Sequence, residues 1–282
     1  MKISKDNARD MIRLTDEALL KLEGTDAIKF LHGQTTADFA SAAPGALLRG
    51  AFCDPKGRVL ADFLAAIIST EQIWLRSRRT VAEALLSHLE RYLMFSKATL
   101  SLVDWAVSAA PGHAAAEPAL DPQGGSMLIP RGEALTEYWS APSASVRGTL
   151  TMAGFHAREI ALKEARIDKE TIGSYLPQDL NYDLNDAVSF KKGCYTGQEI
   201  IARLHFRGTP KRRLYRATSR DESVITPGTP VTAAETDKTL GSVVNSAPSE
   251  GCTVMLIEAV ADVFERQPQI ADGRPLSPAQ DA

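Results

Sequence analysis

The sequence has few cysteines, few aromatic residues and no long apolar run. Its three cysteines, Cys53, Cys194 and Cys252, lie far apart, so they provide neither a disulfide framework nor a Cys-x-x-Cys metal site. Residues 1–14 carry charges throughout and lack the apolar stretch of a signal peptide. The longest apolar run, residues 63–68, is much shorter than a membrane span. We therefore expect a reduced, cytoplasmic protein with no membrane segment.

An excess of charge of one sign is also missing. The 32 basic and 35 acidic residues give a net charge of −3, which excludes a histone-like polycation and argues against direct tRNA binding. The phosphate-binding, dinucleotide-binding and zinc-hydrolase motifs (G-x-x-x-x-G-K-[ST], G-x-G-x-x-G and H-E-x-x-H) are absent. The five histidines stand singly, so we expect no metal site.

The apolar residues that are present predict an α+β unit followed by a β-rich region. The length of 282 residues suggests two domains, and 44% hydrophobic residues can form a substantial core. The following elements are expected: a hairpin of residues 47–53 and 58–68 around the turn Asp54–Gly57, strands at 72–76 and 99–103, and helices at 80–94 and 153–165. Glu159 and Lys163 are spaced for an ion pair on the last helix. We expect another short helix to start in 34–38 and little regular structure in 111–130. The short strands predicted in 214–264 indicate a small β-barrel.

Residues 191–203 contain the most informative chemistry. Thr196 and Glu199 precede an apolar run with the spacing of a capping box, which predicts a helix through Ile200, Ile201 and Leu204. Cys194 then lies just outside the helix N-terminus, beside two lysines, and both surroundings favour its thiolate form. Alternatively, Cys194 packs as a small apolar residue and the lysines are solvated. Cys53 and Cys252 lack cationic neighbours and are expected to be structural.

Basic residues are crowded after this segment: Arg203, Arg207, Lys211, Arg212, Arg213 and Arg216, with no acidic residue among them. Such segregation of charge indicates an anionic partner, either a poly-carboxylate cofactor tail or a phosphate backbone, although part of the run can simply be a solvated face. Phe206 and Tyr215 permit ring stacking, but we expect them in the core.

The octapeptide of residues 192–199, Lys-Gly-Cys-Tyr-Thr-Gly-Gln-Glu, resembles the signature of the YgfZ family of folate-binding proteins. That family is related to the T-protein, the aminomethyltransferase of the glycine cleavage system. The resemblance includes residues 22–38, the hairpin turn 54–60 and the continuation 190–214, and is weaker in the C-terminal barrel.

The resemblance implies a T-protein-like α+β fold, with mixed antiparallel sheet domains around a central cavity and a C-terminal β-barrel. It implies a folate-binding region in 1–208, including an α+β subdomain near 46–110, and a barrel in 209–282. Reduced folate, tetrahydrofolate above all, is the implied cofactor. The implied role is in assembly or repair of iron–sulfur clusters, with iron–sulfur enzymes or cluster-assembly proteins as partners and a link to tRNA modification. Cys194 is the residue expected to matter most for function, and the other candidates are Lys192, Gly193, Tyr195, Gly197, Gln198, Glu199, Arg203, Arg207, Asp168 and Asp62.

Two departures from the T-protein pattern keep the function open. Its acidic pair aligns with Ala61-Asp62, so one carboxylate is lost, and its Arg-Leu-Glu-Ala-Gly stretch reads Arg-Ile-Asp-Lys-Glu in residues 166–170. Asp168 can meet the amino-pyrimidine edge of a pterin, or it can simply end a helix. Four hypotheses follow: a folate-dependent accessory protein for iron–sulfur enzymes, a one-carbon (aminomethyl) transferase, a tRNA-binding protein, and a structural relative without ligand.

Overall fold

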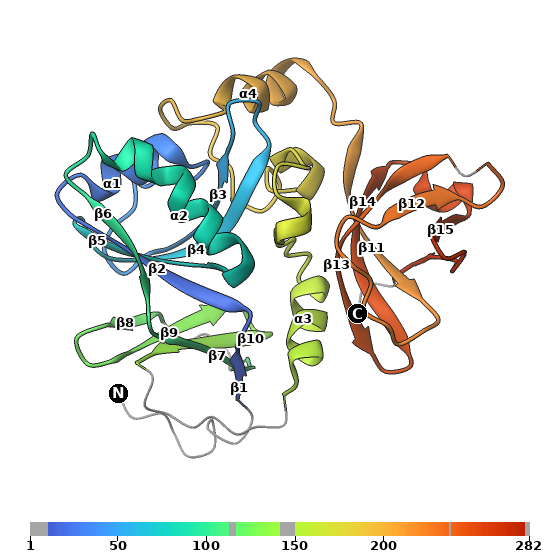
Figure 1. Ribbon diagram of the computed structural model, residues 1–282, viewed down its shortest axis with the longest axis horizontal. Helices are drawn as coiled ribbons and strands as arrows, with labels where there is room; N and C mark the ends of the chain where they lie inside the picture. The colour runs from blue at the N-terminus through green and yellow to red at the C-terminus, as the bar shows by residue number, and fades with distance from the viewer. Residues whose placement is uncertain (1–10, 113–116, 142–149, 237, 280–282) are drawn as a thin grey trace.

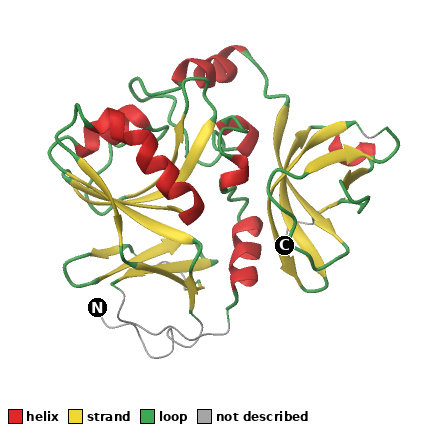
Figure 2. Cartoon of the chain, viewed as in Figure 1, coloured by secondary structure: helices red, strands yellow, loops and turns green. Residues whose placement is uncertain are grey.

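The computed structural model describes residues 11–112, 117–141, 150–236 and 238–279. These residues form three antiparallel sheets and four α-helices (Figures 1 and 2). No helix in the described ranges is long and apolar enough to cross a membrane. The architecture is the α+β fold with mixed antiparallel sheets that the sequence predicted.

The first sheet is buried on both faces. Its strands, in spatial order, are β3 (Leu47–Cys53), β4 (Val59–Ser69), β5 (Gln72–Arg78), β2 (Glu17–Glu23) and β6 (Thr99–Val103). Helices α1 (Ala27–Gln34) and α2 (Arg79–Leu93) contribute to the core on one face. Along β4, Phe63 and Ile67 belong to that core, whereas Leu64 and Ala66 pack towards the second sheet. Burial on both faces explains why this strand is a continuous apolar run.

The second sheet packs against the opposite face of the first. Its strands, in spatial order, are β1 (Ile12–Leu14), β7 (Ala106–Pro111), β10 (Leu135–Ser140), β9 (Ser126–Arg131) and β8 (Ala119–Asp121). Helix α3 (Met152–Ala161) inserts Phe155 into the core that the two sheets share. In Figure 1, α3 stands between these two sheets and the C-terminal sheet.

The third sheet curls around a core of its own, which is the predicted small β-barrel. Its strands, in spatial order, are β15 (Pro268–Ile270), β12 (Pro230–Ala233), β13 (Thr239–Ser249), β14 (Cys252–Val260), β11 (Arg212–Ser219) and β16 (Ser277–Pro278). Val231, Val243 and Ile257 are fully buried inside it. The pairing of β13 with β14 shifts between Val243 and Asn245, and such a bulge re-aims the side chains that follow.

Short 3-10 helices and the helix α4 complete the chain. The 3-10 helices are η2 (Lys169–Thr171), η3 (Pro177–Leu180) and η4 (Val263–Arg266). Helix α4 (Gln198–Arg207) lies across the tip of the β3–β4 hairpin, at the top of Figure 1.

Several local expectations were wrong. No helix starts in residues 34–38: Gln34 is the last residue of α1, and Thr35 makes an isolated bridge with Phe52. The stretch 111–130 contains β8 and the start of β9, although its residues 113–116 lie outside the described ranges. Helix α3 ends before Lys163, and the carboxylate of Glu159 turns inward to arginines and to His156.

Candidate functional site

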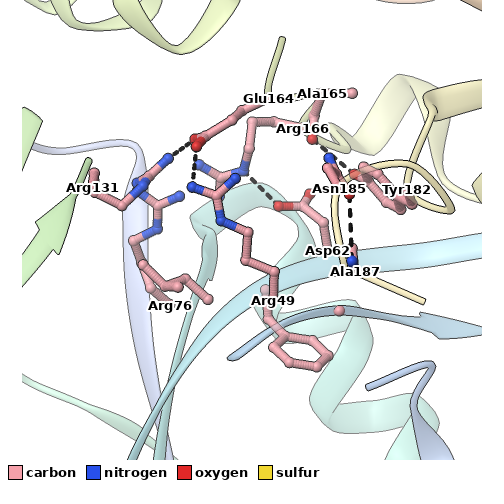
Figure 3. Close-up of a pocket in the computed structure, with 13 residues that line it drawn as sticks. Arg49, Asp62, Arg76, Arg131, Glu164, Ala165, Arg166, Tyr182, Asn185 and Ala187 are labelled. Atoms are coloured by element: carbon pink, nitrogen blue, oxygen red, sulfur yellow. Dashed lines mark hydrogen bonds and ion pairs between the residues drawn. The ribbon is translucent and has the colours of Figure 1, made fainter. Parts of the chain in front are cut away.

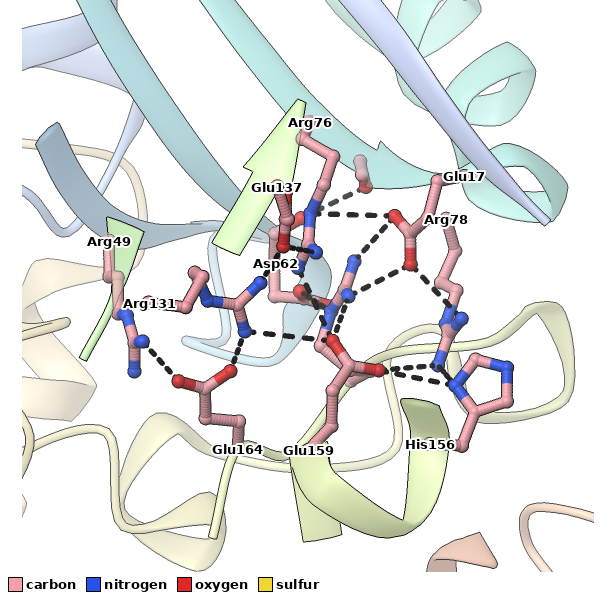
Figure 4. A network of polar contacts seen from close by, with 12 residues as sticks. Glu17, Arg49, Asp62, Arg76, Arg78, Arg131, Glu137, His156, Glu159 and Glu164 are labelled. Carbon is pink, nitrogen blue, oxygen red and sulfur yellow. Dashed lines mark hydrogen bonds and ion pairs between the residues drawn. The ribbon is translucent and has the colours of Figure 1, made fainter. Parts of the chain in front are cut away.

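A buried network of charges occupies the junction of the first two sheets with α3 (Figure 4). Its arginines lie mainly on the sheets and its carboxylates face them from all sides. The members are Arg49, Arg76, Arg78, Arg131 and Arg166 with Glu17, Asp62, Glu137, Glu159 and Glu164. At its edge, Arg78 also pairs with Asp16, and His156 lies within ion-pair distance of Asp16 and Glu159. Buried charges persist only when they are paired in this way.

Arg166 connects the network to the third sheet as well as to the first two. Its guanidinium binds both Glu17 carboxylate oxygens at 2.9 and 3.0 Å, and Glu159 at 2.9 Å. Burial alone would lower the pKa of Arg166, but Asp62, Glu17 and Glu159 raise it well above its usual value. Its backbone N–H and carbonyl both bond the side-chain amide of Asn245, which follows the β13 bulge. The third sheet is thereby fastened to the network.

Asp62 is part of this network and not a free carboxylate. Its Oδ2 accepts a hydrogen bond from the Arg166 Nε at 2.5 Å, and its Oδ1 accepts one from the Ile167 backbone N–H at 2.7 Å. The residue is buried, with 7% exposure. Asp62 therefore holds the chain at residues 166–167 in place.

Two cavities adjoin the network and share Glu164 and Arg166 as a common wall. The first, between the network and Tyr182, has a volume of about 40 Å³, which is room for water only (Figure 3). The second lies between α3 and the third sheet and has a volume of about 170 Å³. Asp168 lines this second cavity together with His156. We take the 170 Å³ cavity as the candidate ligand site.

Asp168 begins the 3-10 helix η2 and does not end an α-helix, because α3 stops at Ala161. Its Oδ1 accepts a hydrogen bond from the Thr80 hydroxyl at 2.8 Å, and its Oδ2 lies 3.9 Å from the Arg78 Nε. The side chain is a quarter exposed. One carboxylate oxygen thus remains available to a ligand in the cavity.

The signature segment is anchored to the end of α1. The Lys192 ammonium donates to the carbonyls of His32 and Thr35, and it lies 4.6 Å from the centre of the Tyr195 ring. Burial lowers the pKa of Lys192 to about 8, although Asp38 opposes the shift. Lys192 therefore caps α1, as C-terminal lysines can, and is not solvated.

The capping box of Thr196 and Glu199 was predicted wrongly. Helix α4 begins after Gly197, which has a φ of +84° and provides no side-chain cap. The reciprocal bonds are made one position earlier, since the Tyr195 N–H donates to the Gln198 side chain and the Gln198 N–H donates to the Tyr195 carbonyl. The Thr196 hydroxyl binds Gln34 instead.

Gly197 lies against the turn of the β3–β4 hairpin. A Cβ at this position would lie 2.5 Å from the Asp54 carbonyl oxygen and 2.9 Å from the Gly57 Cα. Both the positive φ and the close backbone contact therefore require glycine. The turn formed as predicted, with the Gly57 N–H donating to the Asp54 carbonyl at 2.9 Å.

We expect Gly197→Ala to destabilise the protein more than Gly251→Ala. Both glycines have a φ of +84°, but a Cβ at Gly251 would meet nothing within 4 Å. The conformational strain alone costs about 1–2 kcal/mol, and only Gly197→Ala adds a clash with backbone. Urea unfolding of the two variants measures the difference. Equal losses of stability in the two variants would show that the hairpin turn shifts to make room for the added Cβ of Gly197→Ala.

Within the anchored segment, Cys194 is exposed. The alternative that it packs as a small apolar residue is therefore wrong. On one side Gly193 lies beside the His32 ring, and on the other the Thr196 N–H donates to the Gly33 carbonyl. By contrast, Cys53 is buried, where burial raises the pKa of its thiol, and Cys252 is half-buried at the start of β14. The fold thus presents one thiol on a fixed loop.

The structure separates the predicted site residues into two groups. Asp62 and Asp168 lie at the network and its cavities, whereas the signature residues 192–199 lie at the junction of α1 and α4. Arg203 and Arg207 are exposed on α4, and neither lines these two cavities. The expected hold of these arginines on a folate tail is untested, and the folate site proposed below rests on Asp168 instead.

Sequence reasoning missed the network itself. Its members Arg76, Arg131, Glu137 and Glu159 come from four elements and share no motif. A signal was present, because charged residues that interrupt apolar strands and helices, such as Asp62 inside β4, must be paired when they are buried. Such a sequence pattern indicates that a charged residue is buried, but it does not identify the residue that pairs with it.

The architecture matches a known fold. The chain superimposes on the glycine cleavage system aminomethyltransferase T from Bartonella henselae with a TM-score of 0.74 and 15% identity, covering 97% of this chain and 86% of that one. The protein therefore has the T-protein fold. No protein-family model matches the chain.

Relatives with curated names define the family. The chain is 32% identical over 230 residues to the tRNA-modifying protein YgfZ of Photobacterium profundum, covering 74% of this chain and 69% of the relative. It is 30% identical over 230 residues to the protein of that name from Serratia proteamaculans, covering 73% and 69%. An uncharacterized protein of Haemophilus influenzae is 31% identical over 205 residues, covering 72% and 71%. The chain belongs to the YgfZ family.

Proposed function

We propose that the protein is a tetrahydrofolate-binding accessory protein for the assembly or repair of iron–sulfur clusters. Its clients would include enzymes that modify tRNA, in keeping with the name of its relatives. The observation that carries this proposal is the exposed Cys194 thiol on a loop that Lys192 and Gln198 anchor. An exposed sulfur at a rigid position can meet a partner's cluster or thiol without a rearrangement of the fold.

Cys194 would act together with groups of a partner. Among the residues that the structure describes, no three His, Cys, Asp or Glu side chains are arranged to hold a metal ion. An iron–sulfur cluster needs several ligands, usually four. We infer that a partner would supply the remaining ligands for a cluster handled at Cys194.

The 170 Å³ cavity would receive the amino-pyrimidine ring of a reduced folate. A cavity of about 150 Å³ holds a benzene ring, so a volume of about 170 Å³ has room for one ring of the bicyclic pterin and leaves the rest of the folate outside. Asp168 would accept the amino-pyrimidine N–H groups through its available oxygen, as a carboxylate can. When bound, a reduced folate supplies a carrier for one-carbon units.

The burial and the hydrogen bonds of Asp62 favour the accessory role over aminomethyl transfer. Catalysis of proton transfer needs a carboxyl group within reach of the substrate. Both Asp62 oxygens instead accept hydrogen bonds from residues 166 and 167, and the group is buried. The transferase alternative would thus lack the one acidic residue that the sequence retains from the T-protein pair.

Tetrahydrofolate should raise the melting temperature of the protein. A ligand that binds only the folded state at 100 times its Kd adds about 2.7 kcal/mol. For a chain of this size this corresponds to roughly 5–10 °C. Differential scanning fluorimetry with tetrahydrofolate measures the shift.

The matched control is p-aminobenzoyl-glutamate, which carries the tail of folate without the pterin. It should leave the melting temperature unchanged, because it lacks the amino-pyrimidine N–H groups that Asp168 would accept. No shift with saturating tetrahydrofolate would contradict the proposed function, and an equal shift with the control would place the binding elsewhere.

A further inference from the structure

Helix α4 is an unusually exposed helix. Of its ten residues, only Ile201 is buried. At 100° per residue, Arg203 lies opposite Ile201 and marks the centre of the outer face. Ile200 and Phe206 flank Arg203 by about 60° on either side, and they are 37% and 69% exposed. The outer face therefore combines a cation with two apolar side chains.

Three rings form a cluster on this helix and the segment before it. The Phe190 and His205 rings stack at a centroid distance of 3.6 Å and an interplanar angle of 13°. Phe206 lies beside this stack, nearly perpendicular to both rings, at centroid distances of 6.1 and 4.7 Å. It is 69% exposed, so the prediction that Phe206 belongs to the core was wrong. Contact with the other two rings holds Phe206 in place while it remains largely exposed.

Positive charge exceeds negative charge on and beside α4. Arg212 and Arg213 are paired with Glu258 and Asp183 and do not contribute. Four other cations are exposed and have no carboxylate partner within the described part of the chain: Lys191, Arg203, Arg207 and Lys211. Glu199 is the acidic side chain on the outer face of α4. Charges beyond about 10 Å are screened at ordinary salt, so the net charge of −3 does not cancel this local excess.

We propose that the outer face of α4, with Phe190, His205, Phe206 and the four cations, binds single-stranded RNA. A positively charged surface follows a phosphate backbone, and an exposed, fixed aromatic ring provides a platform on which an unpaired base can stack. Loops of folded RNA present such bases, whereas the bases of duplex DNA are already stacked and paired. This surface does not include the folate cavity, so the inference does not depend on folate binding.

Fluorescence anisotropy with a labelled 15-nucleotide oligouridylate tests the proposal on the full chain. Each phosphate contact contributes about 0.7 to the slope of log affinity against log salt for single strands, so four cations predict a slope near −3. Phe206→Ala should weaken binding by about 5- to 150-fold, the range for loss of one stacked base. Phe206→Tyr keeps the ring and should bind as the wild type does.

Arg203→Gln/Arg207→Gln should reduce the magnitude of the salt slope by about 1.4. The matched control is Lys169→Gln/Arg220→Gln, which removes two exposed cations that lie outside α4 and should leave the slope unchanged. Absence of binding at 50 mM salt, or binding that none of the α4 variants weakens, would overturn the inference. Equally tight binding of a 15-residue polyglutamate would overturn it in favour of an acidic protein partner.

Discussion

Arg166→Met should lower the free energy of unfolding by about 3–5 kcal/mol, the cost of breaking a buried ion pair by removing one partner. Arg166 is 3% exposed, and its side chain binds Glu17, Asp62 and Glu159. Without it, these carboxylates would remain buried with too little positive charge. Urea unfolding followed by circular dichroism measures the loss.

Arg166→Lys separates charge from geometry, because lysine keeps the charge but cannot bind both Glu17 oxygens as a planar fork. We expect an intermediate loss. Arg266→Gln removes an exposed arginine that pairs with Asp262 and should leave stability unchanged. A loss below about 1 kcal/mol for Arg166→Met would mean that the network is not what joins the sheets.

Cys194→Ser should abolish the proposed support of iron–sulfur enzymes in cells and leave the melting temperature unchanged. The side chain is exposed, so serine costs no packing, but serine cannot replace the sulfur as ligand or nucleophile. The measurement is the content of an iron–sulfur-dependent modified nucleoside in tRNA from cells that depend on the variant.

Cys252→Ser is the matched control for this experiment. Cys252 is half-buried at the start of β14, and its thiol donates to the Ser249 carbonyl at 3.0 Å, a bond that a serine hydroxyl can make. This variant should keep full support. If cells with Cys194→Ser contain as much of the modified nucleoside as cells with the wild type, the Cys194 thiol is not required.

The parts of the fold that depend on local pattern could be predicted from the sequence. The hairpin of β3 and β4 follows from the Asp54–Gly57 turn between two apolar runs, and α2 follows from the helical spacing of its apolar residues. Strand β6 has the predicted bounds, Thr99–Val103. In each case the residues that predict the element lie within that element or next to it.

Features that depend on distant partners could not be predicted. The capping box failed because Gly197 must fit against the hairpin turn, a contact across 140 residues of sequence. Phe206 is a large apolar residue of the kind that usually lies in a core. Its exposure follows from its place beside the stacked rings of Phe190 and His205, which the sequence does not show. The charge network is likewise a product of three-dimensional neighbours.

Calorimetric titration of tetrahydrofolate into the wild type, Asp168→Asn and Arg207→Ala tests the proposed folate site most directly. Our account predicts saturable binding to the wild type and weakening by about tenfold or more in Asp168→Asn, which loses a charged hydrogen-bond acceptor worth about 1.5–3 kcal/mol. Arg207→Ala should bind normally, since Arg207 does not line the cavity. Unchanged affinity in Asp168→Asn, or no binding to the wild type, would contradict the account.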